Sequence, residues 1–156
     1  MSGTSNARGA GGEAWLLCPG GELATVLAAF EALLPALVLA QDEPESVRFG
    51  AAFAAAGRSA LERVAGGTPA QLTRALEGAL ARSAGRVLLF APAPALAATV
   101  AHVLGLAAGS VRALRIDPGR AFLLRDERVG LVLRHANVCG PEREPGTRLP
   151  LWKSTP

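Results

Sequence analysis

The chain is 156 residues long, half of its residues are hydrophobic, 19% are charged, and the net charge is +3. This length and composition predict one globular domain with a sizeable core. The arginines are scattered, and no helix-turn-helix, zinc-knuckle or aromatic RNA-binding motif accompanies them, which argues against nucleic acid as a partner.

Cysteine and histidine are too few and too dispersed to form a recognisable metal site or disulfide framework. The sequence holds Cys18 and Cys139, together with His102 and His135. We therefore expect free thiols in a reducing cytoplasm, with no metal and no cofactor. The abundance of Ala, Gly, Leu and Arg resembles the coding bias of a GC-rich bacterial genome.

The first half of the chain alternates short apolar strands with helices. After a polar leader over residues 1–12, which lacks the apolar run of a signal peptide, residues 14–18 predict a strand that stops at Pro-Gly-Gly. Residues 22–34 repeat apolar side chains at helical spacing, and residues 36–40 predict a second buried strand. The turn QDEPES then leads to a helix over 45–56.

The middle of the chain continues this alternation. An extended segment over 59–64 precedes Thr68 and Pro69, a helix N-cap followed by a proline at the first helical position, which predict a helix over 69–83. Residues 86–90 predict the third strong strand, and a helix over 95–106 follows it.

The last third predicts strands joined by tight turns. We expect strands over 112–116, 121–125 and 130–136, separated by the turn Asp117-Pro118-Gly119 and by a second turn over 126–128. Strands connected in this way are antiparallel additions to a sheet that is otherwise built by crossovers.

One segment is long and apolar enough to raise the question of a membrane span. Residues 87–109 carry no formal charge and could cross a bilayer by length. Two prolines near the start of the segment and His102 in its middle argue against insertion. A buried strand followed by a buried helix explains the same letters, so we expect no contact with a membrane.

This order of elements predicts an α/β fold. We expect a three-layer sandwich around a mixed, mainly parallel sheet with antiparallel C-terminal strands, in a single domain over 13–139. Such sheets bind ligands at the carboxyl ends of their parallel strands. Residues 140–156 form a Pro-rich tail with one large apolar side chain, and we expect this tail to lie on the surface with Trp152 packed on its own domain.

Several segments together resemble the histidine phosphatase superfamily, whose fold is called phosphoglycerate-mutase-like. The resemblance is good in GGTPAQLTRAL at 66–76, RVLLFAPAPALAATVAHVLGL at 86–106, SVRALRIDPGRAFLL at 110–124 and LVLRHAN at 131–137. It is weaker in the first half, where WLLCPGGE at 15–22 stands in place of the Arg-His-Gly motif of the family. The usual insertion that forms a substrate lid is nearly absent, so the chain resembles a shortened member.

The resemblance implies an active site in which a histidine attacks phosphorus, two arginines and a second histidine bind the phosphoryl oxygens, and an acidic residue protonates the leaving group. This chain departs from the pattern at each of these positions and so offers no catalytic residue of the standard mechanism. The positions of the lost site are Cys18 (first arginine), Pro19 (nucleophilic histidine), Glu45 (second arginine), Thr68 (acid) and Pro92 (second histidine).

Some ligand-binding capacity is still conceivable at the two strand-to-helix junctions. Gly20, Gly21 and Ala93 could offer backbone amides to an anion, and Arg48 could reach the edge of the crevice. Cys18 has two interpretations: a nucleophile activated by a helix N-terminus, or a small buried hydrophobe, which we favour because no histidine or lysine lies nearby in sequence.

We therefore expect a catalytically degenerate protein that acts as a binding, regulatory or assembly component. The alternative is a phosphatase or mutase homologue with residual or altered activity on a phosphorylated small molecule. A protein partner or a homo-oligomer fits the first hypothesis, and a weakly bound phosphorylated ligand fits a third one, a small-molecule sensor.

Overall fold

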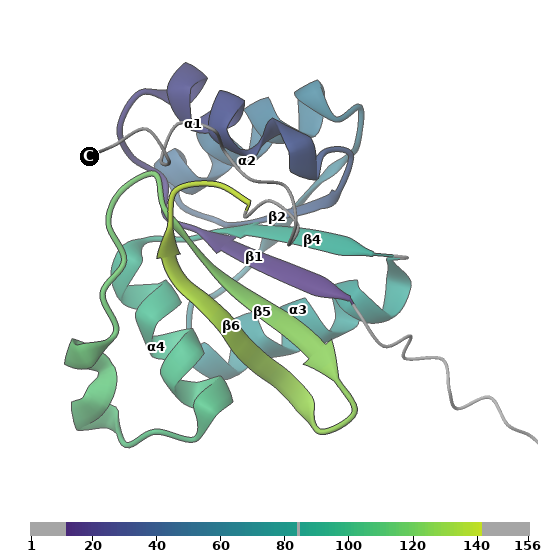
Figure 1. Ribbon diagram of the computed structural model, residues 1–156. Coiled ribbons are helices and arrows are strands. Elements are labelled where there is room, and N and C mark those ends of the chain that lie inside the picture. Colours follow the sequence, from purple (N-terminus) through teal and green to yellow (C-terminus); the bar gives the residue numbers. More distant parts are fainter. Residues whose placement is uncertain (1–11, 84, 142–156) are drawn as a thin grey trace, which may run out of the picture.

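The computed structural model describes residues 12–83 and 85–141 of the chain (Figure 1). Residues 1–11 of the expected leader and residues 142–156 of the expected tail lie outside this part. The strands are β1 Glu13–Leu17, β2 Leu37–Gln41, β3 Leu61–Val64, β4 Arg86–Phe90, β5 Ala121–Glu127 and β6 Gly130–Val138. The helices are α1 Leu23–Phe30, α2 Pro44–Ala56, α3 Pro69–Arg82 and α4 Ala93–Leu104, with short 3₁₀ helices η2 Glu31–Leu33 and η3 Ala108–Ala113.

The six strands form one mixed sheet in the order β3-β2-β4-β1-β5-β6. The first four strands in this order are parallel, as when Leu17 of β1 pairs with Phe90 of β4. β5 is antiparallel to β1, and β6 is antiparallel to β5. The predicted α/β fold with antiparallel C-terminal strands is therefore confirmed, and the carboxyl ends of four parallel strands meet at one edge.

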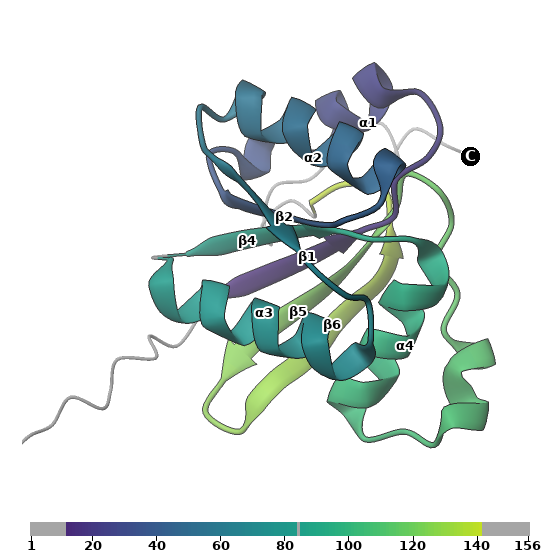
Figure 2. The same ribbon diagram turned by 180° about the vertical axis from the view of Figure 1, so that it is seen from behind.

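Helices cover both faces of the sheet, which explains why the parallel strands are apolar throughout rather than alternating. α1 and α2 lie on one face, where Phe30, Phe49 and Phe53 pack against Phe90 and neighbouring side chains. α3 and α4 lie on the other face, where Leu72 and Leu96 are among the side chains without exposed surface (Figure 2). The result is the expected three-layer sandwich.

Residues 112–116 do not form the expected strand. The 3₁₀ helix η3 extends to Ala113, and the chain then runs irregularly to a turn at Pro118 and Gly119. β1 and β5 are each already paired on both sides, so this segment could join the sheet only beyond β3 or β6. The apolar side chains of this segment contribute to the core instead, since Ile116 is buried in the cluster beneath α3 and α4.

The segment that raised the question of a membrane span divides as expected into a buried strand, β4, and a helix, α4. The helix begins at Ala93 rather than at residue 95 and ends at Leu104, before Gly105 in the left-handed conformation. None of the helices in the described part of the chain has the length and apolar character needed to cross a membrane.

Candidate functional site

The topology places the positions expected from the resemblance along one edge of the sheet. Thr68 follows β3, Glu45 follows β2, Pro92 follows β4 and Cys18 follows β1, in the same order as the strands lie in the sheet. Parallel strands present their carboxyl ends on the same side, which is where ligands bind in folds of this kind. We call this row of loops the carboxyl edge.

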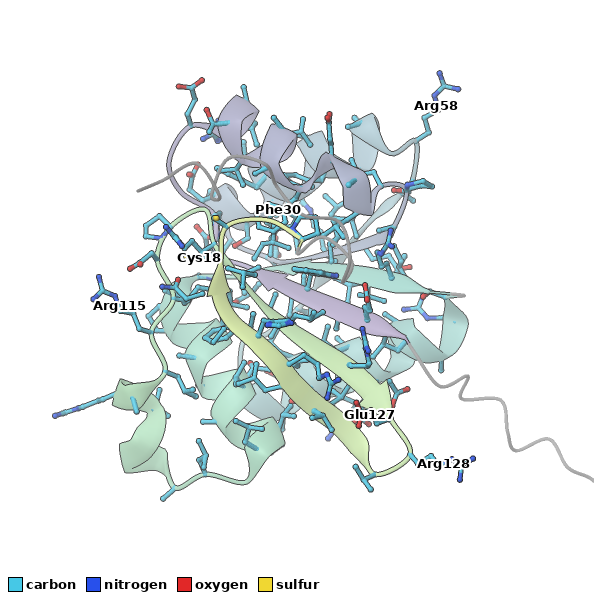
Figure 3. The ribbon with its side chains drawn as sticks, viewed as in Figure 1. Cys18, Phe30, Arg58, Arg115, Glu127 and Arg128 are labelled. Carbon is cyan, nitrogen blue, oxygen red and sulfur yellow. The ribbon has the colours of Figure 1, made fainter. Side chains whose placement is uncertain are left out.

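The two junctions that carry proline lie next to each other. β1 and β4 are neighbours, and beyond their last pair the Ala91 amide still donates to the Leu17 carbonyl at 3.4 Å. The backbone of Ala93 is close enough to the Cys18 thiol to act on its pKa, and the thiol itself donates to the Pro19 carbonyl at 3.7 Å. Cys18 and the Pro92 loop therefore face each other across adjacent strands, as the sequence comparison requires, and Figure 3 shows Cys18 at the end of β1.

Cys18 does not have the surroundings of an activated nucleophile. Its side chain is buried, and this burial raises the pKa of the thiol, because the thiolate would lose its hydration. The Ala93 amide acts in the opposite direction, whereas the negative charge of Asp117 raises the pKa further. The net direction is upward, which favours the interpretation of Cys18 as a small buried hydrophobe.

A turn before β5 closes over the first junction. The Cys18 amide donates to the Arg120 carbonyl at 2.9 Å, and the Gly119 amide donates to the Cys18 carbonyl at 2.9 Å. A Cβ atom added to Gly20 would lie 2.6 Å from the Cβ of Pro118, so the turn packs directly on the backbone of the loop. Both backbone groups of Cys18 are thus used within the protein.

The position of this turn is fixed by a side-chain pair. The Asp117 amide donates to Oδ1 of Asn137 at 2.9 Å, and Nδ2 of Asn137 donates to Oδ2 of Asp117 at 3.1 Å. Arg115 pairs with the same carboxylate, and these contacts, that of Asn137 foremost, lower the pKa of Asp117. Arg120 donates to the Asn137 carbonyl, so the end of β6 and the turn are held together.

The N-terminus of α2 already holds a carboxylate of its own chain. Glu43 accepts from the amides of Glu45 and Ser46 at 3.1 and 3.0 Å and from the Ser46 hydroxyl at 2.7 Å. These bonds, that of the hydroxyl foremost, lower the pKa of Glu43. Helix N-termini attract anions such as phosphate, and here the internal carboxylate occupies the place.

The start of α3 is satisfied by its own side chains, and the start of α4 has fewer donors than an ordinary helix. Thr68 and Gln71 form a reciprocal capping box at α3. Next to this capping box, the side-chain amide of Gln41 lies so close to Gly67 that a Cβ atom added to Gly67 would clash with it. At α4, the prolines at positions 92 and 94 have no backbone N–H to donate.

Arg48, the cation expected at the crevice edge, is engaged on its own helix. Its Nε lies 2.8 Å from a carboxylate oxygen of Glu45, and its guanidinium lies over the Phe49 ring at 5.2 Å. Glu45 brings negative charge to the place where the resemblance would have an arginine. This pair adds no net positive charge to the carboxyl edge.

The remaining candidate groups lie elsewhere. His102 is on the exposed side of α4, and His135 is on β6, the last strand of the sheet. Within residues 12–83 and 85–141, no three His, Cys, Asp or Glu side chains cluster as a metal site would require. A depression of about 600 Å³ lies at the opposite, amino ends of the strands, where Glu13, Leu37 and Arg86 contribute to its wall.

The sequence reasoning missed three groups that shape this edge. Glu43 stands directly before a proline that opens a helix, which is a local signal for a cap that could have been recognised. The contact of Pro118 with Gly20 and the pair of Asp117 with Asn137 join segments that are far apart in the chain, and local pattern carries no signal for them.

Comparison with known proteins identifies the fold but no close relative. Neither a family model nor a curated protein matches the sequence. The fold is similar to the alpha-ribazole phosphatase from Shigella flexneri, with a TM-score of 0.67 at 12% identity over 85% of this chain and 100% of the other. It is also similar to a mycobacterial glucosyl-3-phosphoglycerate phosphatase, with a TM-score of 0.62 at 14% identity over 80% of this chain and 98% of the other. A phosphoserine phosphatase from Entamoeba histolytica matches with a TM-score of 0.63 at 7% identity over 81% of this chain and 97% of the other.

These likenesses define the class of fold. The chain has a phosphoglycerate-mutase-like fold, which it shares with these phosphatases, and this agrees with the fold that the sequence resemblance predicts. The match covers nearly the whole of each neighbour, so the likeness in fold extends over the full length of these phosphatases.

Proposed function

We propose that this chain is a non-catalytic protein of the histidine phosphatase fold that acts as a binding, regulatory or assembly component. The observation that supports this proposal is the occupation of the carboxyl edge by the chain's own groups. Glu43 holds the amides at the start of α2, Pro118 packs on Gly20, and proline stands at both junctions where the resemblance would have histidine.

The chemistry of phosphoryl transfer supports the same conclusion. The reaction requires positive charge around the equatorial oxygens and a nucleophile in line with the leaving group. Proline supplies neither, and Glu45 reverses the sign of the charge expected at its position. Loss of a nucleophile or its base alone costs on the order of 10⁶ in turnover, so the loss of the whole set leaves no route for the standard mechanism.

The proposal is tested by turnover and by ligand-induced stabilisation. We expect the purified chain to hydrolyse p-nitrophenyl phosphate and phosphoserine no faster than buffer, and its melting temperature to be unchanged by inorganic phosphate. Turnover that persists through purification and is lost in Cys18→Ser or Arg48→Ala, but not in the control Val129→Ala on an exposed turn, would contradict it.

The second candidate function is a phosphatase or mutase homologue with residual activity on a phosphorylated small molecule. It is favoured by the names of the structural neighbours, each of which is a phosphatase. A third candidate, a sensor of phosphorylated small molecules, predicts a rise in melting temperature without turnover. The assays above separate the three candidates.

The binding role itself is tested by partner capture. We expect the immobilised chain to retain a specific protein from native lysate, or light scattering to show a homo-oligomer. The two free cysteines of the described chain, Cys18 and Cys139, agree with a reducing cytoplasm as the compartment for this role.

A further inference from the structure

The sheet face beneath α1 and α2 is covered by helices over only half its width. These two helices lie over β2 and β4, whereas β5 and β6 show the same face with no described helix above them (Figure 1). Trp15 of β1, Leu123 of β5 and Val138 at the end of β6 belong to the apolar cluster on this face. We call these three residues the Trp15 strip.

Trp15 and Leu123 of this strip are buried and Val138 is partly buried, although no described helix lies over the β5 side. Trp15 is 3% exposed and Leu123 is 5% exposed. Phe30 of α1 contacts Trp15 edge-on, with ring centroids 6.2 Å apart, which accounts for one side of the indole. Antiparallel strands without a layer above them normally leave that face in water, so the low exposure of Trp15 and Leu123 points to a further segment over the strip.

The described chain ends beside this strip. After β6 the backbone turns back toward α1, and a Cβ atom added to Gly140 would lie 3.0 Å from the Ala29 carbonyl oxygen. In the 3₁₀ helix η2 that follows α1, the Ala32 carbonyl oxygen lies 3.5 Å from Nη1 of Arg86. Pro141, the last described residue, therefore lies at the border between α1 and the uncovered half of the sheet, and residues 142–156 follow it in the sequence.

The reach of the same segment, its apolar run and the two glutamates near its start favour it as the occupant. Arg86 and Arg125 both pair with the single carboxylate of Glu13, at 3.3 and 3.4 Å, which leaves one excess positive charge at the border of the strip. The segment begins with Glu142 and Glu144, which flank Arg143, and after Arg148 it carries the apolar run Leu149-Pro150-Leu151-Trp152, followed by Lys153. Residues 142–152 span at most roughly 36 Å, and the distance from β6 to β4 is only about 15 Å.

We propose that residues 142–156 dock on the Trp15 strip of their own chain, with Leu149–Trp152 as the apolar contact and the two glutamates beside Arg86 and Arg125. The segment supplies the missing part of the outer layer, in the place where a third helix would lie. This role is independent of whether the carboxyl edge turns over phosphate.

The two tryptophans of the chain, Trp15 and Trp152, allow a direct test. Trp152→Phe leaves Trp15 as the single reporter, and its emission and acrylamide quenching are compared with those of a chain that ends at Pro141. We expect truncation to shift the emission to longer wavelength, to raise the quenching constant severalfold and to lower the melting temperature by about 5 °C. A chain lacking only residues 153–156 is the matched control and should leave all three values unchanged.

Two further measurements keep the proposal open to failure. If the truncated chain does not fold, the full-length double variant Leu149→Ser and Leu151→Ser in the Trp152→Phe background should show the same increase in quenching. A synthetic peptide of residues 142–156 added to a folded truncated chain should restore protection of Trp15. Equal quenching with and without the segment overturns the proposal, as does a full-length dimer that truncation converts to a monomer, because the segment would then be exchanged between two copies.

Discussion

The interior of the sheet and its carboxyl edge are stabilised in different ways. In the interior, strands such as β4 are covered on both faces, and side chains such as Phe90 have no exposed surface. At the carboxyl edge, the same strands end in loops whose amides are bound by Glu43, Thr68 and the turn around Pro118. The interior relies on apolar burial, and the edge relies on polar groups and close backbone contacts.

This difference explains how chains can share a fold while the residues at their strand ends differ. Apolar packing tolerates many sequences of similar volume and pattern, which fits identities of 7 to 14% with neighbours that share the framework. The chemistry depends on a few side chains at strand ends, and each can be replaced without disturbing the packing beneath it. Cys18 and Pro92 follow two such strand ends, those of the paired strands β1 and β4.

The largest effect is expected from a truncation in the interior. Phe90→Ala removes a ring that lies 4.8 Å from Phe53 and 6.3 Å from Phe49, between centroids, and the resulting cavity should destabilise the chain by about 3–5 kcal/mol. Urea unfolding measures this loss. Val129→Ala, at a side chain that is 87% exposed, should change the free energy of unfolding by less than about 0.5 kcal/mol. Similar losses in the two variants would contradict the packing described for the interior.

A second prediction concerns the closure of the carboxyl edge. Gly20→Ala places a Cβ 2.6 Å from that of Pro118, at a φ of +151° that side chains rarely adopt, and should cost about 2–3 kcal/mol. Gly21→Ala is the matched control, because it has a positive φ of +74° but no neighbour within 4 Å, and should cost about 1 kcal/mol.

Pro118→Gly combined with Gly20→Ala separates the clash from the backbone strain. Removing the pyrrolidine ring should recover part of the stability lost in Gly20→Ala, as measured by a double-mutant cycle in urea. Strictly additive effects of the two changes would show that the turn does not press on the loop.

How much could be predicted from the sequence differs between the same two regions. In the interior, apolar runs and helical periodicity predicted β1, β2 and β4 and the helices that cover them, because local pattern reflects burial. The exception is the segment 112–116, whose apolar letters resemble a strand. β1 already pairs with β4 and β5, and β5 already pairs with β1 and β6, so neither strand has a free edge for this segment. Local sequence pattern does not report whether a strand has a free edge.

At the carboxyl edge, the sequence predicted which loops meet but not how they are filled. The adjacency of Cys18 and the Pro92 loop followed from the resemblance and is confirmed by the pairing of β1 with β4. The contact of Pro118 with Gly20 depends on the path of the chain after η3, which the sequence analysis placed in a strand. A local error in secondary structure thus concealed a long-range contact.

A smaller effect is expected from the carboxylate at the start of α2. Glu43→Ala removes the acceptor of the Glu45 and Ser46 amides and should destabilise the chain by about 1 kcal/mol at neutral pH. Because the folded state lowers the pKa of Glu43, its stabilisation is present above the ordinary pKa of a glutamate, about 4.3, and is lost as the pH falls through the lower pKa of the folded state.

The measurement for Glu43 is urea unfolding of both chains between neutral pH and pH 3. The stability difference between the parent and Glu43→Ala should shrink toward the acid end of this range. Glu45→Ala, which removes a carboxylate that pairs with Arg48 on the exposed surface, is the control and should show a smaller difference at neutral pH. A difference for Glu43 that is independent of pH would show that its carboxylate does not cap the helix.

The smallest effect on stability, and the sharpest test of the edge, concerns the two thiols. Cys139 is exposed and Cys18 is buried, and burial raises the pKa of Cys18, so less of it is thiolate at a given pH. In Cys139→Ser, the remaining Cys18 should react with a disulfide reagent at pH 8 more than about tenfold slower than Cys139 reacts in Cys18→Ser. The unfolded chains should react at equal rates. Rapid reaction of Cys18 in the native chain would mean an accessible thiolate at the end of β1, and the carboxyl edge would then be a reactive site rather than a closed one.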